Sequence, residues 1–347
     1  MPTPYISGFA AFLFGLATLP IVKQLARRYT LYDAPGPLKI HQAPIPRLGG
    51  IAMFAGFLAG SLLLYIPASR PSLLPLFAFA VVWAVGLIDD IWTLGSLVRF
   101  CFHIAVGCAL WFAGWRLEWL ASPALDLTAT CLFVAFLINA MNLLDGMDGL
   151  AAGVAAISSI GFLIISSNSR NAVELTVASS LLGACAAMFS VNAPPAKMFM
   201  GDSGSTLLGI VLAFLSLNYT RGQSDPHSSI LIPLIFLSIP LTDALLAILR
   251  RARSHKLLFQ GDRRHFYDIL LQRGWSVGRV LKHSIGSTGI LVLAGWLCAR
   301  GVAGAWLIGA VVLGGLAICA SLLGSLQSDS KSIQTGQQEA SLGSALE

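Results

Sequence analysis

The chain has 347 residues, of which 56% are hydrophobic and only 11% are charged, and its formal net charge is +6. Soluble domains carry roughly 25% charged residues, so this composition excludes a soluble enzyme, a disordered regulator and a nucleic-acid-binding domain. What remains is an all-α, polytopic integral membrane protein, in which each charged residue needs a specific reason to be present.

Long apolar stretches predict about 10–11 transmembrane helices, since a spanning helix needs about 20 apolar residues. In chain order they are expected near residues 4–24, 49–67, 73–88, 98–115, 125–141, 149–167, 173–191, 204–219, 229–249, 284–300 and 302–324. We therefore expect one membrane domain over residues 1–324. Residues 325–347 are polar and rich in Ser and Gln, a composition typical of a disordered tail.

The basic residues predict how the chain is oriented in the membrane. The first apolar stretch has no Lys or Arg before it, whereas three basic residues follow it directly, as in an anchor whose N-terminus lies outside. With that orientation most of the 22 basic residues lie inside, and the exceptions are Arg70, Arg116, Arg170, Arg221 and Arg300. The positive charge therefore indicates topology and contact with anionic lipid, and nucleic acid is not an expected partner.

Aspartates gather at the predicted inner ends of the apolar stretches. Asp89 and Asp90 end the third stretch, Asp145 and Asp148 lie between the fifth and sixth, and Asp202 opens the eighth. Carboxylates beside apolar helices are costly and mark functional sites. Five on one side would repel one another without a cation, and oxygen ligands suit Mg²⁺, which binds one or two carboxylates together with substrate phosphates.

Each of these motifs also has a purely structural explanation. The Asp pair of GLIDD is compatible with a solvated helix end, DGMDG with a turn, and Asp202 with a helix N-cap. Their occurrence on one side favours a common site. In addition, the small residues of GDSGS (201–205) enter a predicted helix N-terminus, where free N–H groups and the helix dipole attract phosphate.

The long basic segment after the ninth stretch contains GDRRHFYDILLQRG (261–274). Its pattern predicts an amphipathic helix on anionic lipid. It also places Arg263, Arg264 and His265 where they can bind a phosphate or a sugar of a substrate. His265 and Asp268 are three residues apart, so we expect them to pair on one helix face.

Together these motifs resemble the polyprenyl-phosphate N-acetylhexosamine-1-phosphate transferases, glycosyltransferase family 4, which include the initiators of O-antigen and the peptidoglycan translocase. The matching segments are DAPGPLKIHQAPIPRLGG (33–50), GLIDD (86–90), NAMNLLDGMDGLAAG (139–153), NAPPAKMFMGDSGSTLLG (192–209), PLTD (240–243) and DRRH (262–265). The resemblance implies a bacterial inner-membrane enzyme with its catalytic loops and active site on the cytoplasmic face. Such an enzyme uses Mg²⁺ or Mn²⁺, transfers a sugar-1-phosphate from a UDP-sugar to undecaprenyl phosphate, and releases UMP.

The resemblance also implies roles for individual residues. Asp202 is expected to be the principal metal ligand, with Asn142 as a second. Asp89 and Asp90 are expected to act at the lipid phosphate, so that the catalytic set is Asp89, Asp90 and Asp202. The residues expected to bind substrate are Lys39, His41, Arg99, Asn142, Asp145, Asp148, Asn192, Phe199, Arg263, Arg264 and His265. Among these, Asn192 and Phe199 would contact the uracil.

Departures from the family pattern narrow the substrate. Thr93 stands where peptidoglycan translocases have a lysine, and their His-rich loop motif is absent. Hexosamine transferases often show HxHH in the last loop, where this chain has HFYD at 265–268. DRRHFYD is similar to the branch that starts O-antigen with 6-deoxy N-acetyl sugars. We expect UDP-GlcNAc or a 6-deoxy relative such as UDP-FucNAc or UDP-QuiNAc as the donor, with phospho-MurNAc-pentapeptide transfer as the alternative.

A secondary transporter is the rival from another class of protein. Transporters place their sites near the bilayer midplane between broken helices and often contain inverted repeats. Here the acidic motifs lie at predicted helix ends and the sequence shows no repeat, which favours the enzyme. Whether the chain forms a homodimer is left open by the sequence.

Overall fold

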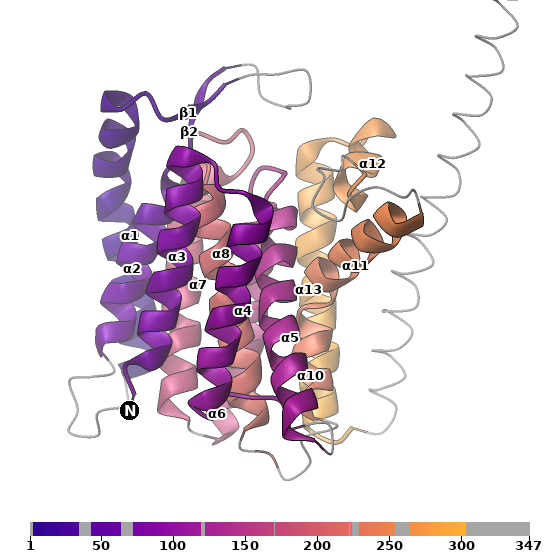
Figure 1. Cartoon of the computed structure of the whole chain (residues 1–347). Helices are drawn as coiled ribbons and strands as arrows, with labels where there is room; N and C mark the ends of the chain where they lie inside the picture. The colour runs from indigo at the N-terminus through magenta and orange to yellow at the C-terminus, as the bar shows by residue number, and fades with distance from the viewer. Residues whose placement is uncertain are drawn as a thin grey trace, which may run out of the picture.

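The computed structural model describes residues 3–34, 43–63, 72–118, 122–169, 171–221, 223, 229–253 and 264–302. Over these ranges the chain is a bundle of helices (Figure 1), as the all-α prediction requires. A two-residue ladder is the one β element of the described chain, with β1 (Tyr32–Asp33) antiparallel to β2 (Ile45–Pro46). This ladder lies at the upper end of the bundle in Figure 1.

The helices of the described residues are α1 (Thr3–Arg28), α2 (Gly49–Leu62), α3 (Leu74–Trp92), α4 (Ser96–Phe112), α5 (Pro123–Leu144), α6 (Leu150–Ser169), α7 (Ala172–Asn192), α8 (Gly201–Thr220), α10 (Leu231–Phe236), α11 (Ser238–Arg253), α12 (Phe266–Gln272) and α13 (Val277–Ala299). Among them, seven are long and apolar enough to cross a membrane, namely α1, α3, α5, α6, α7, α8 and α13. The prediction of a polytopic membrane protein is confirmed. The expected span at 302–324 and the tail at 325–347 lie outside the described residues.

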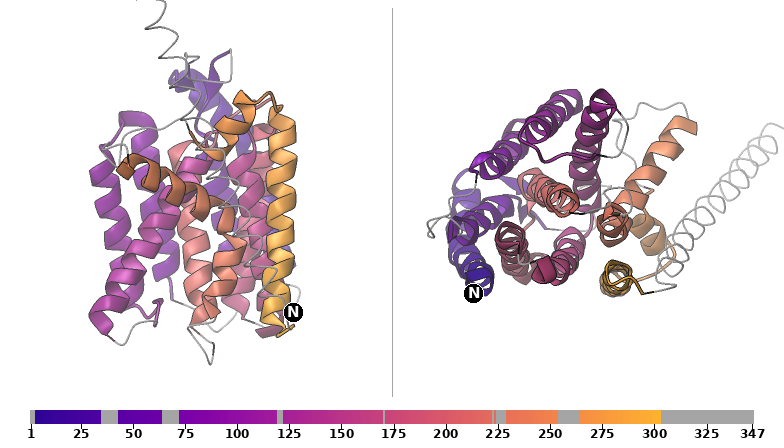
Figure 2. Two further views of the ribbon diagram at one scale, coloured as in Figure 1. Left: turned by 90° about the vertical axis from the view of Figure 1, so that its right-hand side faces the viewer. Right: turned by 90° about the horizontal axis from the view of Figure 1, so that it is seen from below.

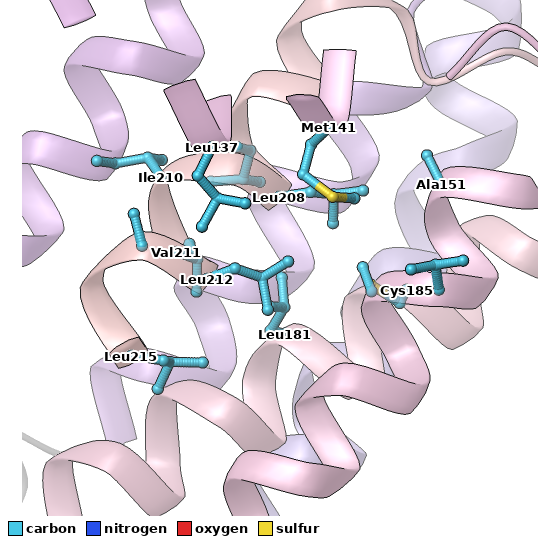
Figure 3. Close-up of a cluster of buried hydrophobic side chains, with 14 of the residues drawn as sticks. Leu137, Met141, Ala151, Leu181, Cys185, Leu208, Ile210, Val211, Leu212 and Leu215 are labelled. Carbon is cyan, nitrogen blue, oxygen red and sulfur yellow. The ribbon is translucent and has the colours of Figure 1, made fainter. Parts of the chain in front are cut away.

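Helix α8 lies in the middle of the bundle, with other helices around it (Figure 2, right). Its sequence is apolar or small on every face, and a helix of that kind is normally buried. Gly209 lets α5 approach closely, because a Cβ there would meet the backbone of Ile138. Figure 3 shows side chains of α5, α7 and α8 meeting in this region, among them Leu137, Leu181 and Leu212. Helix α8, including its N-terminus, is therefore surrounded by other helices.

The ninth predicted span, 229–249, is broken into α10 and α11, so the expectation of one continuous helix there is wrong. Pro240 has no N–H to donate to the Phe236 carbonyl four residues earlier. Ser158 Oγ donates to that carbonyl instead, over 3.0 Å. A side chain from another helix thus satisfies the freed backbone group, as broken membrane helices require. Beyond the break, α11 runs at a steep angle to the bundle (Figure 2, left).

Candidate functional site

The predicted site residues converge at the end of the bundle where α3 and α5 finish and α8 begins, the upper end in Figure 1. We call this the site end. Both α3 and α5 pack directly against α8. Their C-terminal residues therefore surround the first turn of α8, and Asp89, Asp90, Asn142 and Asp202 are brought together although they are far apart in the sequence.

Asp202, in the first turn of α8, is the most accessible carboxylate of this group, with 29% of its side chain exposed. Its Oδ1 accepts a hydrogen bond from Asn142 Nδ2 over 2.8 Å, and its Oδ2 accepts from Arg99 Nη1 over 3.0 Å. Asn142 also donates to Ser205 Oγ over 3.0 Å. Asp202 and Asn142, the residues expected to hold a metal, are thus hydrogen-bonded to each other, and the guanidinium of Arg99 lies beside them.

Asp89 is buried, and both of its oxygens are bound by the connection between α3 and α4 and by α4 itself. One carboxylate oxygen accepts from the N–H of Leu94, and the other accepts from Arg99 Nη1. Thr93, with a φ of 51°, ends α3 and turns the chain so that α4 can start beside it. Arg99 therefore bridges Asp89 and Asp202, and 23% of its own side chain remains exposed.

Asp90 caps the N-terminus of α8 from a neighbouring helix. Its Oδ1 accepts from the N–H of Asp202 (2.9 Å) and from Arg47 Nη2 (3.0 Å). Its Oδ2 accepts from the N–H (3.0 Å) and the Oγ (2.8 Å) of Ser203. The helix end that the sequence suggested as a phosphate site is thus already occupied by a carboxylate of this chain. A carboxylate is stabilised there by the same donors and helix dipole that attract phosphate.

Arg47 is a site residue that the sequence reasoning did not single out. The only signal was its place in IPRLGG, just before the first turn of α2. That turn packs tightly on the loop before α8: the N–H of Gly49 donates to Phe199 O (2.9 Å) and the N–H of Gly50 to Met200 O (2.8 Å). A Cβ on Gly50 would collide with the backbone of Gly204, so only glycine fits at position 50.

The loop before α8 is also fastened to the turn between α5 and α6. Asn192, which is buried, accepts from the N–H of Gly149 and donates to Met198 O, both over 3.0 Å. Asp148 accepts from the N–H of Ala196 over 2.9 Å. In this structure both residues hold the loop in place. Phe199, the other residue expected at the uracil, is half-buried, and its N–H donates to Pro46 O over 2.8 Å.

Asp145 follows the last residue of α5 and faces the aspartates of the site end. Burial, together with the charges of Asp202, Asp90 and Asp148, raises the pKa of the Asp145 carboxyl well above its usual value. Desolvation is the main cause, and the neighbouring carboxylates add a negative local field at Asp145. A cation would be attracted to it.

Helix α12 brings His265 to the same end, and the expected pairing with Asp268 is made through a capping box, in which each side chain bonds the backbone of the other residue. His265 Nδ1 lies 2.6 Å from Asp243 Oδ2 on α11. Asp268 accepts a hydrogen bond from the backbone N–H of His265, over 3.3 Å. The reason is local, because His265 precedes the helix and its backbone N–H needs a cap. Arg264 is half-buried beside it. The other predicted residues Lys39, His41 and Arg263 lie outside the described residues.

Comparison with known proteins fits this arrangement. Residues 72–220, which run from α3 to the end of α8, match the sequence profile of glycosyl transferase family 4. A Bacillus subtilis protein named probable undecaprenyl-phosphate N-acetylglucosaminyl 1-phosphate transferase is 31% identical over 280 residues, covering 77% of this chain and 78% of the relative. The chain belongs to glycosyl transferase family 4. The resemblance inferred from the six motifs is confirmed, and membership of this family favours the enzyme over the transporter.

Further relatives cover similar or larger shares of the chain. Decaprenyl-phosphate N-acetylglucosaminephosphotransferase of Mycobacterium leprae is 30% identical over 368 residues, which span 91% of this chain and 89% of the relative. Undecaprenyl-phosphate alpha-N-acetylglucosaminyl 1-phosphate transferase of Escherichia coli K12 is 29% identical over 284 residues, 76% of each chain. These matches extend well beyond the segment from α3 to α8.

Proposed function

We propose that this protein transfers N-acetylglucosamine-1-phosphate from UDP-GlcNAc to undecaprenyl phosphate and releases UMP. The observation that carries the proposal is the contact of Asp202 with both Asn142 and Arg99 at one end of a membrane bundle. It is supported by relatives in Bacillus subtilis and Escherichia coli that are named for this lipid and this sugar. Those names favour GlcNAc over the 6-deoxy sugars that the DRRHFYD string suggested.

The proposed reaction brings two anions together. An oxygen of the lipid phosphate attacks the phosphorus that carries the sugar, a new P–O bond forms, and the bond to the UMP oxygen breaks. The protein must offset charge and hold the groups in line. Arg99 is suited to this role, because Asp89 and Asp202 fix one of its nitrogens while the planar guanidinium has further N–H donors for a phosphate.

Asp89 and Asp90, the two aspartates of GLIDD, have different roles in this proposal. Asp89 orients Arg99, which then faces the substrate phosphates. Asp90 acts through α8, since its carboxylate oxygens accept bonds from Asp202, Ser203 and Arg47 and its side chain is 0% exposed. This geometry does not support the sequence-based expectation that Asp90 meets the lipid phosphate.

A divalent metal, Mg²⁺ or Mn²⁺, is part of the proposal. In the structure the amide nitrogen of Asn142 faces Asp202 and Ser205. The side chains around Asp202 fit the metal once that amide turns over, because Asp202, Asn142 and Ser205 then offer the oxygen ligands that a hard cation prefers. The described residues contain no group of three or more His, Cys, Asp or Glu arranged to hold a metal. Mg²⁺ takes one or two protein ligands and completes its shell with water and phosphate. When bound, the metal offsets diphosphate charge.

We further propose that the protein lies in the bacterial inner membrane with its site end in the cytoplasm. The support is the charge distribution, because the basic C-terminus of α1, with Arg27 and Arg28, lies at the same end of the bundle as the aspartates (Figure 1). From that side the donor is a soluble nucleotide sugar and the product a lipid-linked sugar. Such a product would start O-antigen or another cell-surface polysaccharide.

Incubating membranes that contain the protein with radiolabelled UDP-GlcNAc, undecaprenyl phosphate and Mg²⁺ tests the proposal. We expect a labelled lipid product and UMP. Neither should form when a chelator is added or when the Asp202→Asn variant replaces the wild-type protein. Parallel reactions with UDP-FucNAc, UDP-QuiNAc and UDP-MurNAc-pentapeptide identify the donor. Failure to label the lipid from any of these donors would overturn the transferase, and wild-type turnover by Asp202→Asn would overturn the metal assignment.

A further inference from the structure

A buried carboxylate on α11 has no part in the proposed reaction so far. Asp243 lies in the second turn of α11, and only 3% of its side chain is exposed. Both of its oxygens contact the start of α12: Oδ2 lies 2.6 Å from His265 Nδ1, and Oδ1 accepts from the N–H of Phe266 over 3.1 Å. A buried carboxylate is costly unless it is paired, so this double contact needs a reason.

The His265 ring is connected to the site end through Tyr267. The two rings stack, with centroids 5.4 Å apart and an interplanar angle of 8°. The Tyr267 hydroxyl donates to Leu143 O in the last turn of α5, over 3.1 Å. A Cβ at Gly146 would collide with that hydroxyl. His265 therefore packs on a ring that itself lies on the turn carrying Asp145.

The contact with Asp243 defines what the His265 ring can do. A carboxylate beside Nδ1 requires the proton on that nitrogen, so neutral His265 has Nε2 as a hydrogen-bond acceptor. The contact with Asp243 uses Nδ1, which leaves Nε2 as the ring nitrogen for a ligand.

We propose that Asp243 is a positioning residue that fixes the tautomer and orientation of His265, so that Nε2 accepts a hydrogen bond from a hydroxyl or amide N–H of the donor's sugar. This inference rests on the proposed function, and it adds the residue that makes α12 part of the donor site. The break between α10 and α11 contributes, because α11 runs at a steep angle to the bundle beyond it (Figure 2, left), and its second turn places Asp243 at the start of α12.

A double-mutant cycle with steady-state kinetics tests the inference. Asp243→Asn keeps the side-chain volume, and we expect it to raise the KM for UDP-GlcNAc on the order of tenfold while the KM for undecaprenyl phosphate stays unchanged. In a His265→Ala background the same change should alter the donor KM by less than about twofold, because a residue that acts through His265 has nothing left to position.

Asp268→Asn is the matched control, since it loosens the same end of α12 through the backbone N–H of His265 and does not touch the ring. We expect its effect on the donor KM to stay below about twofold and to be the same with and without His265. If Asp243→Asn is equally harmful in the His265→Ala background, or if it changes only the KM for the lipid, the positioning role is wrong.

A measurement that needs no turnover separates this inference from the proposed function. In ¹⁵N-histidine NMR of the protein in nanodiscs, the signal that disappears in His265→Ala should show the proton on Nδ1. Asp243→Asn should shift that signal toward the other tautomer. A wild-type His265 with its proton on Nε2 would overturn the inference even in an active enzyme. An inactive wild-type protein with the expected tautomer would overturn only the proposed function and the sugar contact.

Discussion

Replacing Asp90 by Asn separates a residue that positions Asp202 from one that takes part in the chemistry. The substitution keeps the shape of the side chain but removes its charge and turns one acceptor oxygen into an NH₂ group. In the structure both oxygens of Asp90 accept two hydrogen bonds each, from Asp202, Ser203 and Arg47. In either orientation of its amide, an Asn at this position turns its NH₂ group toward N–H or O–H groups that also donate, so those groups lose their acceptor.

The magnitude follows from which partners lose their acceptor. Leaving a buried donor unsatisfied costs about 1–3 kcal/mol. If the new NH₂ group faces Ser203, the N–H and the Oγ of that residue both lose their bond. If it faces Arg47 and the N–H of Asp202, the loss is smaller, because the Arg47 side chain is 34% exposed and water can solvate it. The amide takes the less costly orientation, in which the N–H of Asp202 is the buried donor that loses its acceptor, so we expect α8 to be destabilised at its first turn by about 1–3 kcal/mol.

Thermal unfolding in detergent and transfer assays over a range of Mg²⁺ concentrations measure this effect. Asp90→Asn should lower the unfolding temperature and raise the Mg²⁺ concentration needed for half-maximal turnover, because Asp202 is no longer held in place. Asp126→Asn, in the first turn of α5 at the opposite end of the bundle, is the control and should leave the metal dependence unchanged. An Asp90→Asn protein that is inactive yet has wild-type stability and metal dependence would refute the positioning argument.

Three more substitutions probe the geometry. Gly50→Ala should lower the unfolding temperature strongly, because the added Cβ would meet the α8 backbone. Gly278→Ala is the control, since that glycine has open space around it, and equal melting curves for the two variants would contradict the close packing. Arg99→Lys should reduce turnover at least about tenfold, since an ammonium lacks the planar fork that bridges two carboxylates and, in the proposed reaction, binds a phosphate. Turnover near wild type would show that the bridge is dispensable. Ser158→Ala should lower the free energy of unfolding by about 1–3 kcal/mol, because the Phe236 carbonyl at the α10–α11 break loses its hydrogen-bond donor. An unchanged free energy of unfolding would mean that water replaces the hydroxyl.

The helices and the convergence of the motifs were predictable, because apolar length and the placing of charged residues are dictated by the bilayer. The partners of individual side chains were not. That Asp90 caps α8 depends on how α3 lies against α8, and no local sequence pattern encodes that arrangement. The same is true of Asp243, which meets His265 only because Pro240 breaks the ninth apolar stretch and α11 leaves the bundle axis. Arg47 was overlooked because its partner Asp90 is distant in sequence.

The glycine contacts around α8 hold the helices next to it, α2, α3 and α5, in close backbone contact with it. Gly50 on α2, Gly86 on α3 and Gly209 on α8 each bring another helix so near α8 that a single methyl group would not fit. Backbones packed in this way do not slide past one another without large rearrangement. Adjustments that accompany the arrival and release of substrates are therefore expected on the side of α11 and α12. There, the described contacts between α11, α12 and the end of α5 are made by the side chains of Asp243, His265 and Tyr267.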